Sequence, residues 1–236
     1  MPDPLVLVPG LGCDARLFAP QIEVLSRRGP VTVLPSAQGE RIEEIASQAL
    51  PHLPAKFALA GHGFGGMVAM EMLRRAPDRV LRLALISTAP LADTPAEAAA
   101  REPRIIGAKA GRFDDAIAEE VPPGALAPGP DRAARLALFR QMARDLGVDA
   151  YVRQVRALQR RKDQQPVLRR CKAPVLVLAG AHDTLVPVKR QRQMAELIGQ
   201  GGFTVIEEAG HLPSLEAPEN VTDALSDWLV APFVLR

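Results

Sequence analysis

The chain has 236 residues, of which 47% are hydrophobic and 24% charged, and its formal net charge is +2. This length and composition are ordinary for one globular domain with a sizeable core, and no apolar stretch approaches the length of a transmembrane helix. The small net charge gives no support for binding to nucleic acid or to an anionic membrane. The two cysteines, Cys13 and Cys171, are too few for a disulfide framework and lack metal-ligand spacing, so we expect a cytoplasmic protein without metal or cofactor.

Six apolar segments, taken in chain order, are predicted to be β-strands. They cover residues 5–8, 31–34, 57–60, 80–87, 174–179 and 203–206. Helical segments lie between them, an alternation that is typical of a doubly wound, mostly parallel sheet. The fifth segment is apolar without interruption, as expected of a parallel strand that is buried on both faces. We therefore predict an α/β fold with a sheet of about six strands.

The turn after the third predicted strand contains glycines at positions 61, 63 and 65, and a helix follows it. A strand-to-helix turn with glycine two residues before and two residues after its apex is the nucleophile elbow, Gly-x-Ser-x-Gly. The flanking Gly61 and Gly65 are needed because a Cβ would clash where strand and helix approach each other. The apex itself is Gly63, which offers no nucleophilic atom. The chain thus has the elbow of a hydrolase without the group that attacks the substrate.

Residues 91–170 are predicted to be helical and to interrupt a core made of residues 1–90 and 171–236. Thr94 and Glu97 have the spacing of a capping box at a helix start. Apolar residues recur at helical spacing in two stretches of this segment. The first contains Leu136, Phe139, Met142 and Leu146, and the second contains Val148, Tyr151, Val152, Val155 and Leu158. The segment therefore reads as an insertion made of helices.

Two further polar residues follow the last two predicted strands. Asp183 lies in the loop after residues 174–179, and His211 lies in the loop after residues 203–206. Taken alone, Asp183 could cap the helix that follows it and His211 could be a surface residue. The chain order of elbow, aspartate and histidine is the order of the catalytic triad in α/β hydrolases, and this order favours catalysis.

With these motifs the chain resembles the α/β-hydrolase superfamily, and within it the small esterases and enol-lactonase-like members that carry a helical cap. The resemblance runs from Pro-Gly-Leu-Gly at 9–12, through the elbow, to Gly-x-x-Asp-x-x-x-Pro at 180–187 and Gly-His-x-x-x-x-Glu-x-Pro at 210–218. It implies that residues 91–170 form a cap over an active site. It also implies hydrolysis of a carboxylic ester or a lactone through an acyl-enzyme.

The same resemblance implies a role for each site residue. Gly63 occupies the nucleophile position, where serine is expected. His211 would be the general base, and Asp183 would fix its tautomer and stabilise its imidazolium form. The backbone N–H groups of Leu11 and Phe64 would form the oxyanion hole.

Four other reactive side chains in these segments are expected to be structural. Cys13 is near the turn at 9–12 but has no predicted base, so we expect a small buried core residue. His62 is expected to pack inside the elbow, and His182 to be a loop neighbour of the aspartate. Ser214 is close to the histidine in sequence but lies on the wrong side of the loop to replace an elbow nucleophile.

Three explanations of Gly63 stay open from the sequence. The chain is a serine hydrolase whose nucleophile has been replaced, a natural ligand-binding protein on a hydrolase scaffold, or a non-hydrolytic enzyme such as a lyase. Retention of both Asp183 and His211 favours the first, because a site without function has no physical need for them. An aspartate nucleophile is disfavoured by Phe64, since relatives with that nucleophile often have tryptophan after the apex.

The substrate is the least determined feature. Residues 91–170 contain 15 Lys and Arg against 11 Asp and Glu, and a positive cap would favour anionic esters or lactones. Several of these arginines fall on the polar side of one helix, which favours a solvated face instead. They are Arg153, Arg156, Arg160 and Arg161. We expect a small-molecule ester or lactone as partner, with no nucleic acid and no membrane; the oligomeric state is not predicted.

Overall fold

The computed structural model describes residues 3–199 and 201–232 and contains one six-stranded sheet. The strands are β1 (Leu5–Val8), β2 (Val31–Val33), β3 (Phe57–His62), β4 (Val80–Ile86), β5 (Val175–Gly180) and β6 (Gly201–Ile206). Their order in the sheet is β2-β1-β3-β4-β5-β6, and every neighbouring pair is parallel. The predicted α/β fold with a parallel sheet of six strands is confirmed.

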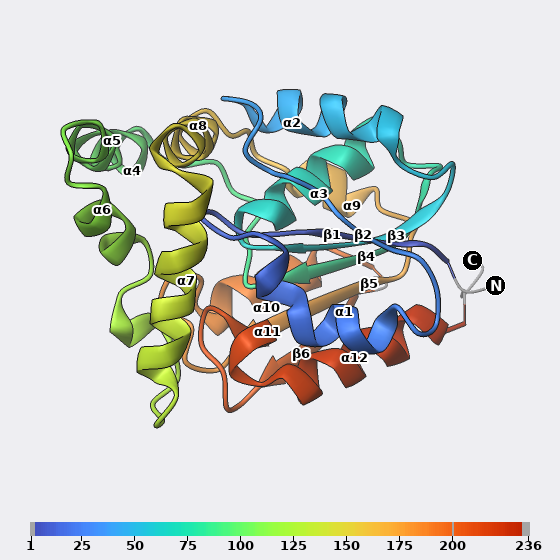
Figure 1. Ribbon diagram of the computed structural model, residues 1–236. Coiled ribbons are helices and arrows are strands. Elements are labelled where there is room, and N and C mark those ends of the chain that lie inside the picture. Colours follow the sequence, from blue (N-terminus) through green and yellow to red (C-terminus); the bar gives the residue numbers. More distant parts are fainter. Residues whose placement is uncertain (1–2, 200, 233–236) are drawn as a thin grey trace.

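Helices cover both faces of the sheet, because the strands present apolar side chains on both. In β1, Leu5 and Leu7 pack on one side and Val6 and Val8 on the other, as the two-residue period of a strand requires. In Figure 1, α2 and α3 lie above the sheet, and α1 and α12 lie below it. The first group, defined by packing on the side of Val6 and Val8, contains α2 (Ile42–Ala49), α3 (Phe64–Arg75), α9 (Gln165–Arg169) and α10 (Val188–Glu196). The second contains α1 (Ala19–Leu25), α11 (Pro213–Glu216) and α12 (Pro218–Val230).

The chain between β4 and β5 is fully described and contains helices but no strand, as predicted. Thr94 and Glu97 form the expected capping box, in which the Thr94 hydroxyl accepts from the Glu97 N–H and the Glu97 carboxylate accepts from the Thr94 N–H. Five of these helices stand together at one end of the sheet (Figure 1). They are α4 (Pro95–Ala100), α5 (Glu102–Lys109), α6 (Phe113–Glu120), α7 (Arg132–Leu146) and α8 (Val148–Gln159).

The part of the chain that the structure describes also contains three short 3-10 helices: η1 (Ala15–Phe18), η2 (Leu50–His52) and η3 (Pro123–Ala125). Among the described residues, no helix combines the length and the apolar character that crossing a membrane requires.

The predicted and observed strands differ most at ends that are formed by glycine or histidine. β3 continues two residues further than predicted, because His62 still pairs with Ile86 of β4. β6 begins two residues earlier than predicted, because Gly201 and Gly202 pair with β5. Glycine has weak strand preference, so its pairing is set by the neighbouring strand and not by its own sequence signal.

Candidate active site

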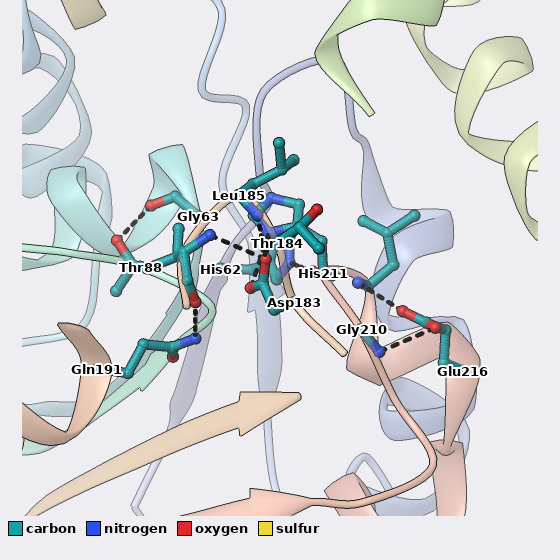
Figure 2. A network of polar contacts seen from close by, with 12 residues as sticks. His62, Gly63, Thr88, Asp183, Thr184, Leu185, Gln191, Gly210, His211 and Glu216 are labelled. Atoms are coloured by element: carbon teal, nitrogen blue, oxygen red, sulfur yellow. Dashed lines mark hydrogen bonds and ion pairs between the residues drawn. The ribbon is translucent and has the colours of Figure 1, made fainter. Parts of the chain in front are cut away.

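The turn between β3 and α3 has an unusual backbone at its apex. Gly63 has φ 51° and ψ −114°, in a region that residues with side chains rarely adopt. Its N–H donates to the carbonyl of Ile86 over 2.9 Å, and its carbonyl accepts from the Thr88 hydroxyl over 2.7 Å (Figure 2). The apex is therefore held on both sides by the end of β4 and the residues that follow it.

The glycines around the apex differ in the space that surrounds them. A Cβ at Gly61 would overlap the backbone of Gly65, and a Cβ at Gly65 would overlap the carbonyl of Val8. A Cβ at Gly63, in contrast, would make only ordinary contacts, 3.8 Å from His211 Nε2 and 3.8 Å from the Ser87 carbonyl oxygen. Position 63 therefore has room for a side chain, and that side chain would stand against His211.

Asp183 and His211 form a hydrogen-bonded pair. His211 Nδ1 lies 3.0 Å from one Asp183 carboxylate oxygen and 3.1 Å from the other. The same carboxylate accepts the backbone N–H groups of Leu185 and Val186 over 3.0 and 2.9 Å (Figure 2). Burial alone would raise the pKa of Asp183, but His211 and these two N–H groups hold it below its usual value. With Nδ1–H donating to Asp183, Nε2 of a neutral His211 is an acceptor on the side of position 63.

A buried glutamate fixes the loop that carries the histidine. The Glu216 carboxylate accepts the N–H groups of Gly210 and Leu212, the residues on either side of His211, over 3.0 and 2.8 Å (Figure 2). It also accepts the N–H of Ala127, which belongs to the inserted segment, over 2.7 Å. Glu216 belongs to the motif at 210–218, and the contacts show what it does there: it orients the His211 backbone.

The two amides that the resemblance assigned to an oxyanion hole line the same cavity as Gly63 and His211. They belong to Leu11, in the turn after β1, and to Phe64, the first residue of α3. Neither N–H donates a hydrogen bond to another described residue. The N–H of Phe64 also stands at the positive end of the helix dipole, where negative charge is stabilised.

His62 lies beside His211 and contacts both its ring and its backbone; the two ring centroids lie 5.2 Å apart in an edge-on arrangement. His62 Nε2 is 2.6 Å from the His211 carbonyl oxygen, and since a carbonyl only accepts, Nε2 carries the proton. The side chain is buried, and this burial, together with the proximity of His211, lowers the pKa of His62 to about 3. His62 is therefore neutral at physiological pH and holds the loop of His211 against the turn after β3.

The site opens into a cavity of about 320 Å³ that is lined both by the helices between β4 and β5, the predicted insertion, and by the rest of the chain, the predicted core. Core residues in its wall include Leu11, Gly63 and His211, and residues of the insertion include Arg101, Phe139 and Arg161. Cys13 also reaches the wall, but burial and the nearby Asp14 carboxylate raise the pKa of its thiol, so it remains an unreactive SH group. Within residues 3–199 and 201–232, His, Cys, Asp and Glu side chains form no group of three that could hold a metal ion.

Ser87 is a polar residue of the cavity wall that the sequence did not single out. The sequence predicts it as the last residue of a strand, but β4 ends at Ile86, and Ser87 has φ 46°. It is fully buried, and its hydroxyl has no hydrogen-bond partner among the described residues. What distinguishes Ser87 is its backbone angle φ next to the turn at Gly63, and the residue type alone does not reveal this angle.

Known proteins similar to this chain identify its family and share its fold. A model of the alpha/beta hydrolase family matches residues 5–224. The pimeloyl-[acyl-carrier protein] methyl ester esterase of Aromatoleum aromaticum is 29% identical over 206 residues, 81% of each chain. A thermophilic esterase from Thermogutta terrifontis superposes with a TM-score of 0.86 at 28% identity, over 96% of this chain and 89% of that one. An enol-lactonase from Burkholderia xenovorans LB400 shares the fold with a TM-score of 0.83 at 24% identity, over 96% of this chain and 91% of the other.

Proposed function

The chain belongs to the alpha/beta hydrolase family, and on that premise we propose that its site is that of a carboxylic ester or lactone hydrolase whose nucleophile has been replaced by glycine. One observation carries the proposal: a Cβ at position 63 would lie 3.8 Å from His211 Nε2, the free nitrogen of a histidine oriented by Asp183. A serine at this apex would bring its hydroxyl within reach of that nitrogen.

In the serine form, the hydroxyl oxygen attacks the ester carbonyl while His211 Nε2 takes its proton. The N–H groups of Leu11 and Phe64 donate to the oxyanion that forms, and Asp183 stabilises the imidazolium. His211 then returns the proton to the alcohol that leaves as the ester C–O bond breaks. A water molecule, deprotonated by the same nitrogen, attacks the acyl-serine; His211 then returns this proton to the serine oxygen as the acyl C–O bond breaks, and the carboxylic acid is released. Residues 91–170 act as a cap that closes this site over the core formed by 1–90 and 171–236.

The chain with Gly63 has the base and the oxyanion donors but no oxygen to acylate. Such a site can still activate water weakly, and a comparable triad without its nucleophile keeps roughly 10³–10⁴-fold catalysis over water. The preserved Asp183–His211 pair favours replacement of a serine over the two alternatives, a ligand-binding protein on this scaffold and a lyase-like enzyme.

The test is to restore the nucleophile. Gly63→Ser should raise hydrolysis of short nitrophenyl esters or lactones by orders of magnitude over the parent chain. In the serine form, His211→Ala should abolish the gain, and Asp183→Asn should lower kcat by about 10⁴-fold through the wrong histidine tautomer.

His182→Ala is the matched control, because His182 is an exposed neighbour of Asp183. It should leave the activity of the serine form unchanged. If Gly63→Ser hydrolyses no ester, thioester or lactone in a broad screen, the hydrolase proposal is wrong, and the ligand-binding and lyase-like alternatives take its place.

A further inference from the structure

The cavity above Gly63 has an arginine-rich wall. Arg101, Arg161 and Arg190 all line it. Asp93 joins the first two: its carboxylate oxygens lie 2.8 Å from Arg101 Nε and 2.8 Å from Arg161 Nη2. The Asp93 side chain is only 3% exposed, and those of Arg101 and Arg161 are 19% and 14% exposed. Two guanidinium groups, largely withdrawn from bulk water, therefore share one carboxylate.

This arrangement leaves one positive charge without a buried counterion. Burial lowers the pKa of Arg161, and the neighbouring charges of Arg101 and Arg190 lower it further, while Asp93 and the exposed Glu97 act in the opposite direction. Arginine stays protonated in proteins, so the excess charge remains in the wall. Arg190 forms no ion pair with another described residue, but it is exposed, so solvent screens its charge.

The other acidic residues of the cavity wall either pair with another group or are exposed to solvent. Arg104 pairs with Glu120 over 2.9 Å, so this arginine is neutralised within the insertion. Glu97 closes the capping box of α4, and Glu119 is exposed, where solvent screens its charge. Neither offers the excess charge a buried partner.

Some N–H groups of Arg161 and Arg101 also lack a hydrogen-bond acceptor among the described residues. Arg161 Nε is buried and has no partner among the described residues, and Arg161 Nη1 contacts only the Met67 sulfur, over 3.3 Å. Arg101 donates to Asp93 through Nε and forms no other hydrogen bond with a described side chain. Buried donors without acceptors are unfavourable, and a bound anion would satisfy them.

The other arginines in α8 and directly after it do not line the cavity. Arg153 donates to the Ala37 carbonyl, Arg156 pairs with Glu102, and Arg160 pairs with Glu40. None of these three lines the cavity. Of the four arginines that the sequence placed on a polar helix side, only Arg161 turns toward the site.

We propose that Arg161 and Arg101, with Arg190, bind a free carboxylate on the substrate, so that the substrate class is a small ester or lactone that also carries a carboxylate. Guanidinium forks match the planar carboxylate, and Asp93 already shows that one fits between the first two arginines. Asp93 positions these two side chains. The assignment of a substrate class rests on the proposed function, and the volume of about 320 Å³ suits a small one.

The test uses two esters of the same length that differ in charge. Monomethyl glutarate carries an ester and a carboxylate, whereas dimethyl glutarate carries two esters. Titration calorimetry on the chain with Gly63, which needs no turnover, should show the half-ester binding at least about tenfold more tightly, the size expected of a charge-assisted hydrogen bond. Arg161→Gln should remove this preference. Arg160→Gln, one residue away and outside the cavity, should keep it.

Two further measurements cover a variant that does not fold. Arg101→Gln tests the other side of the Asp93 bridge and should also reduce the preference. On the unmodified chain, added salt should weaken binding of the half-ester more than binding of the diester, because chloride competes for the guanidinium groups. Equal binding of both esters, or identical behaviour of Arg161→Gln and Arg160→Gln, would overturn the carboxylate site.

The same two esters separate this inference from the proposed function. If Gly63→Ser hydrolyses both with equal kcat/KM, the hydrolase proposal stands and the carboxylate site is wrong. If the chain with Gly63 binds the half-ester through Arg161 but Gly63→Ser hydrolyses neither, the carboxylate site stands and the hydrolase proposal is wrong.

Discussion

At position 63 the backbone and the proposed chemistry make opposite demands. A φ of 51° with ψ −114° suits glycine, whereas attack on a carbonyl needs a side-chain oxygen. Surrounding atoms do not decide between them, since a Cβ there would make only contacts of 3.8 Å. A serine at this apex is therefore disfavoured by its own backbone conformation and by nothing else in the site.

Because only the backbone conformation opposes a serine at position 63, the effect of Gly63→Ser on stability can be predicted. Gly63→Ser should introduce strain of roughly 1–3 kcal/mol in the folded state and recover about 0.4–1 kcal/mol by restricting the unfolded chain. The free energy of unfolding should fall by about 1 kcal/mol, equivalent to a Tm decrease of roughly 2–4 °C for a chain of this size. Urea or thermal melts of the two chains measure it.

Gly129→Ser is the control for that comparison, because a Cβ at Gly129 meets nothing within 4 Å and its φ lies outside the left-handed region. It should be as stable as the parent chain or slightly more so. A serine form at position 63 that is equally stable would show that the apex is not strained.

The position of a single residue could be predicted from the sequence where its neighbours in the chain fix its place. Asp183 and His211 each follow an apolar strand, so their approach at one sheet edge was predictable. Ser87 and Glu216 depend on a φ angle and on three backbone amides that come together only in the fold.

Among the elements, the short segment from Gly210 to Glu216 is one that connects residues 91–170 to the rest of the chain. It carries His211, and its backbone is fixed by Glu216. The N–H of His211 donates to the carbonyl of Ala125 in η3 over 2.7 Å. The histidine loop therefore depends on the insertion as much as on the core.

Glu216→Gln should destabilise the protein, because an amide retains one acceptor oxygen and turns an NH₂ group toward a backbone N–H. Hydrogen bonds to a charged group contribute about 1.5–3 kcal/mol each, so the free energy of unfolding should fall by at least about 1.5 kcal/mol. Glu208→Gln, on an exposed turn, should change it by no more than about 0.5 kcal/mol. Urea melts compare the three chains, and equal stability of Glu216→Gln and Glu208→Gln would contradict the role given to Glu216.

The helical spacing of apolar residues predicted helices between β4 and β5, and Leu136, Phe139 and Met142 are buried as their spacing indicated. The period does not tell which polar residues of a helix face a cavity. Arg160 and Arg161 are adjacent in sequence, yet only Arg161 lines the cavity, because the chain leaves α8 at this point. That difference is decided by tertiary packing.

Across the whole molecule, core and insertion are joined by buried polar contacts at the site. Gln154 of α8 is fully buried, and its side-chain oxygen accepts the N–H of Gly12, next to the amide of Leu11, over 2.9 Å. Its amide nitrogen donates to the Ser36 hydroxyl over 3.2 Å. Six strands with helices between them could be predicted from the sequence, whereas such contacts between distant segments could not.

Two buried groups near this junction make the free energy of unfolding depend on pH. Both Asp183 and His62 have pKa values below their usual ones in the folded state, so the unfolded chain binds more protons as the pH falls. For His62 the sign is definite: with a folded pKa of about 3, its contribution to stability is complete above the unfolded pKa of about 6.5 and declines below it. The decline approaches about 1.4 kcal/mol per pH unit between these values.

His62→Gln, whose amide can still donate to the His211 carbonyl, should therefore lose less stability than the parent chain between about pH 7 and about pH 5 in urea melts. His52→Gln, on the exposed η2, should follow the parent. If all three chains lose the same free energy of unfolding over this range, His62 is not held neutral by the fold, and its place as a buried support of the histidine loop is wrong.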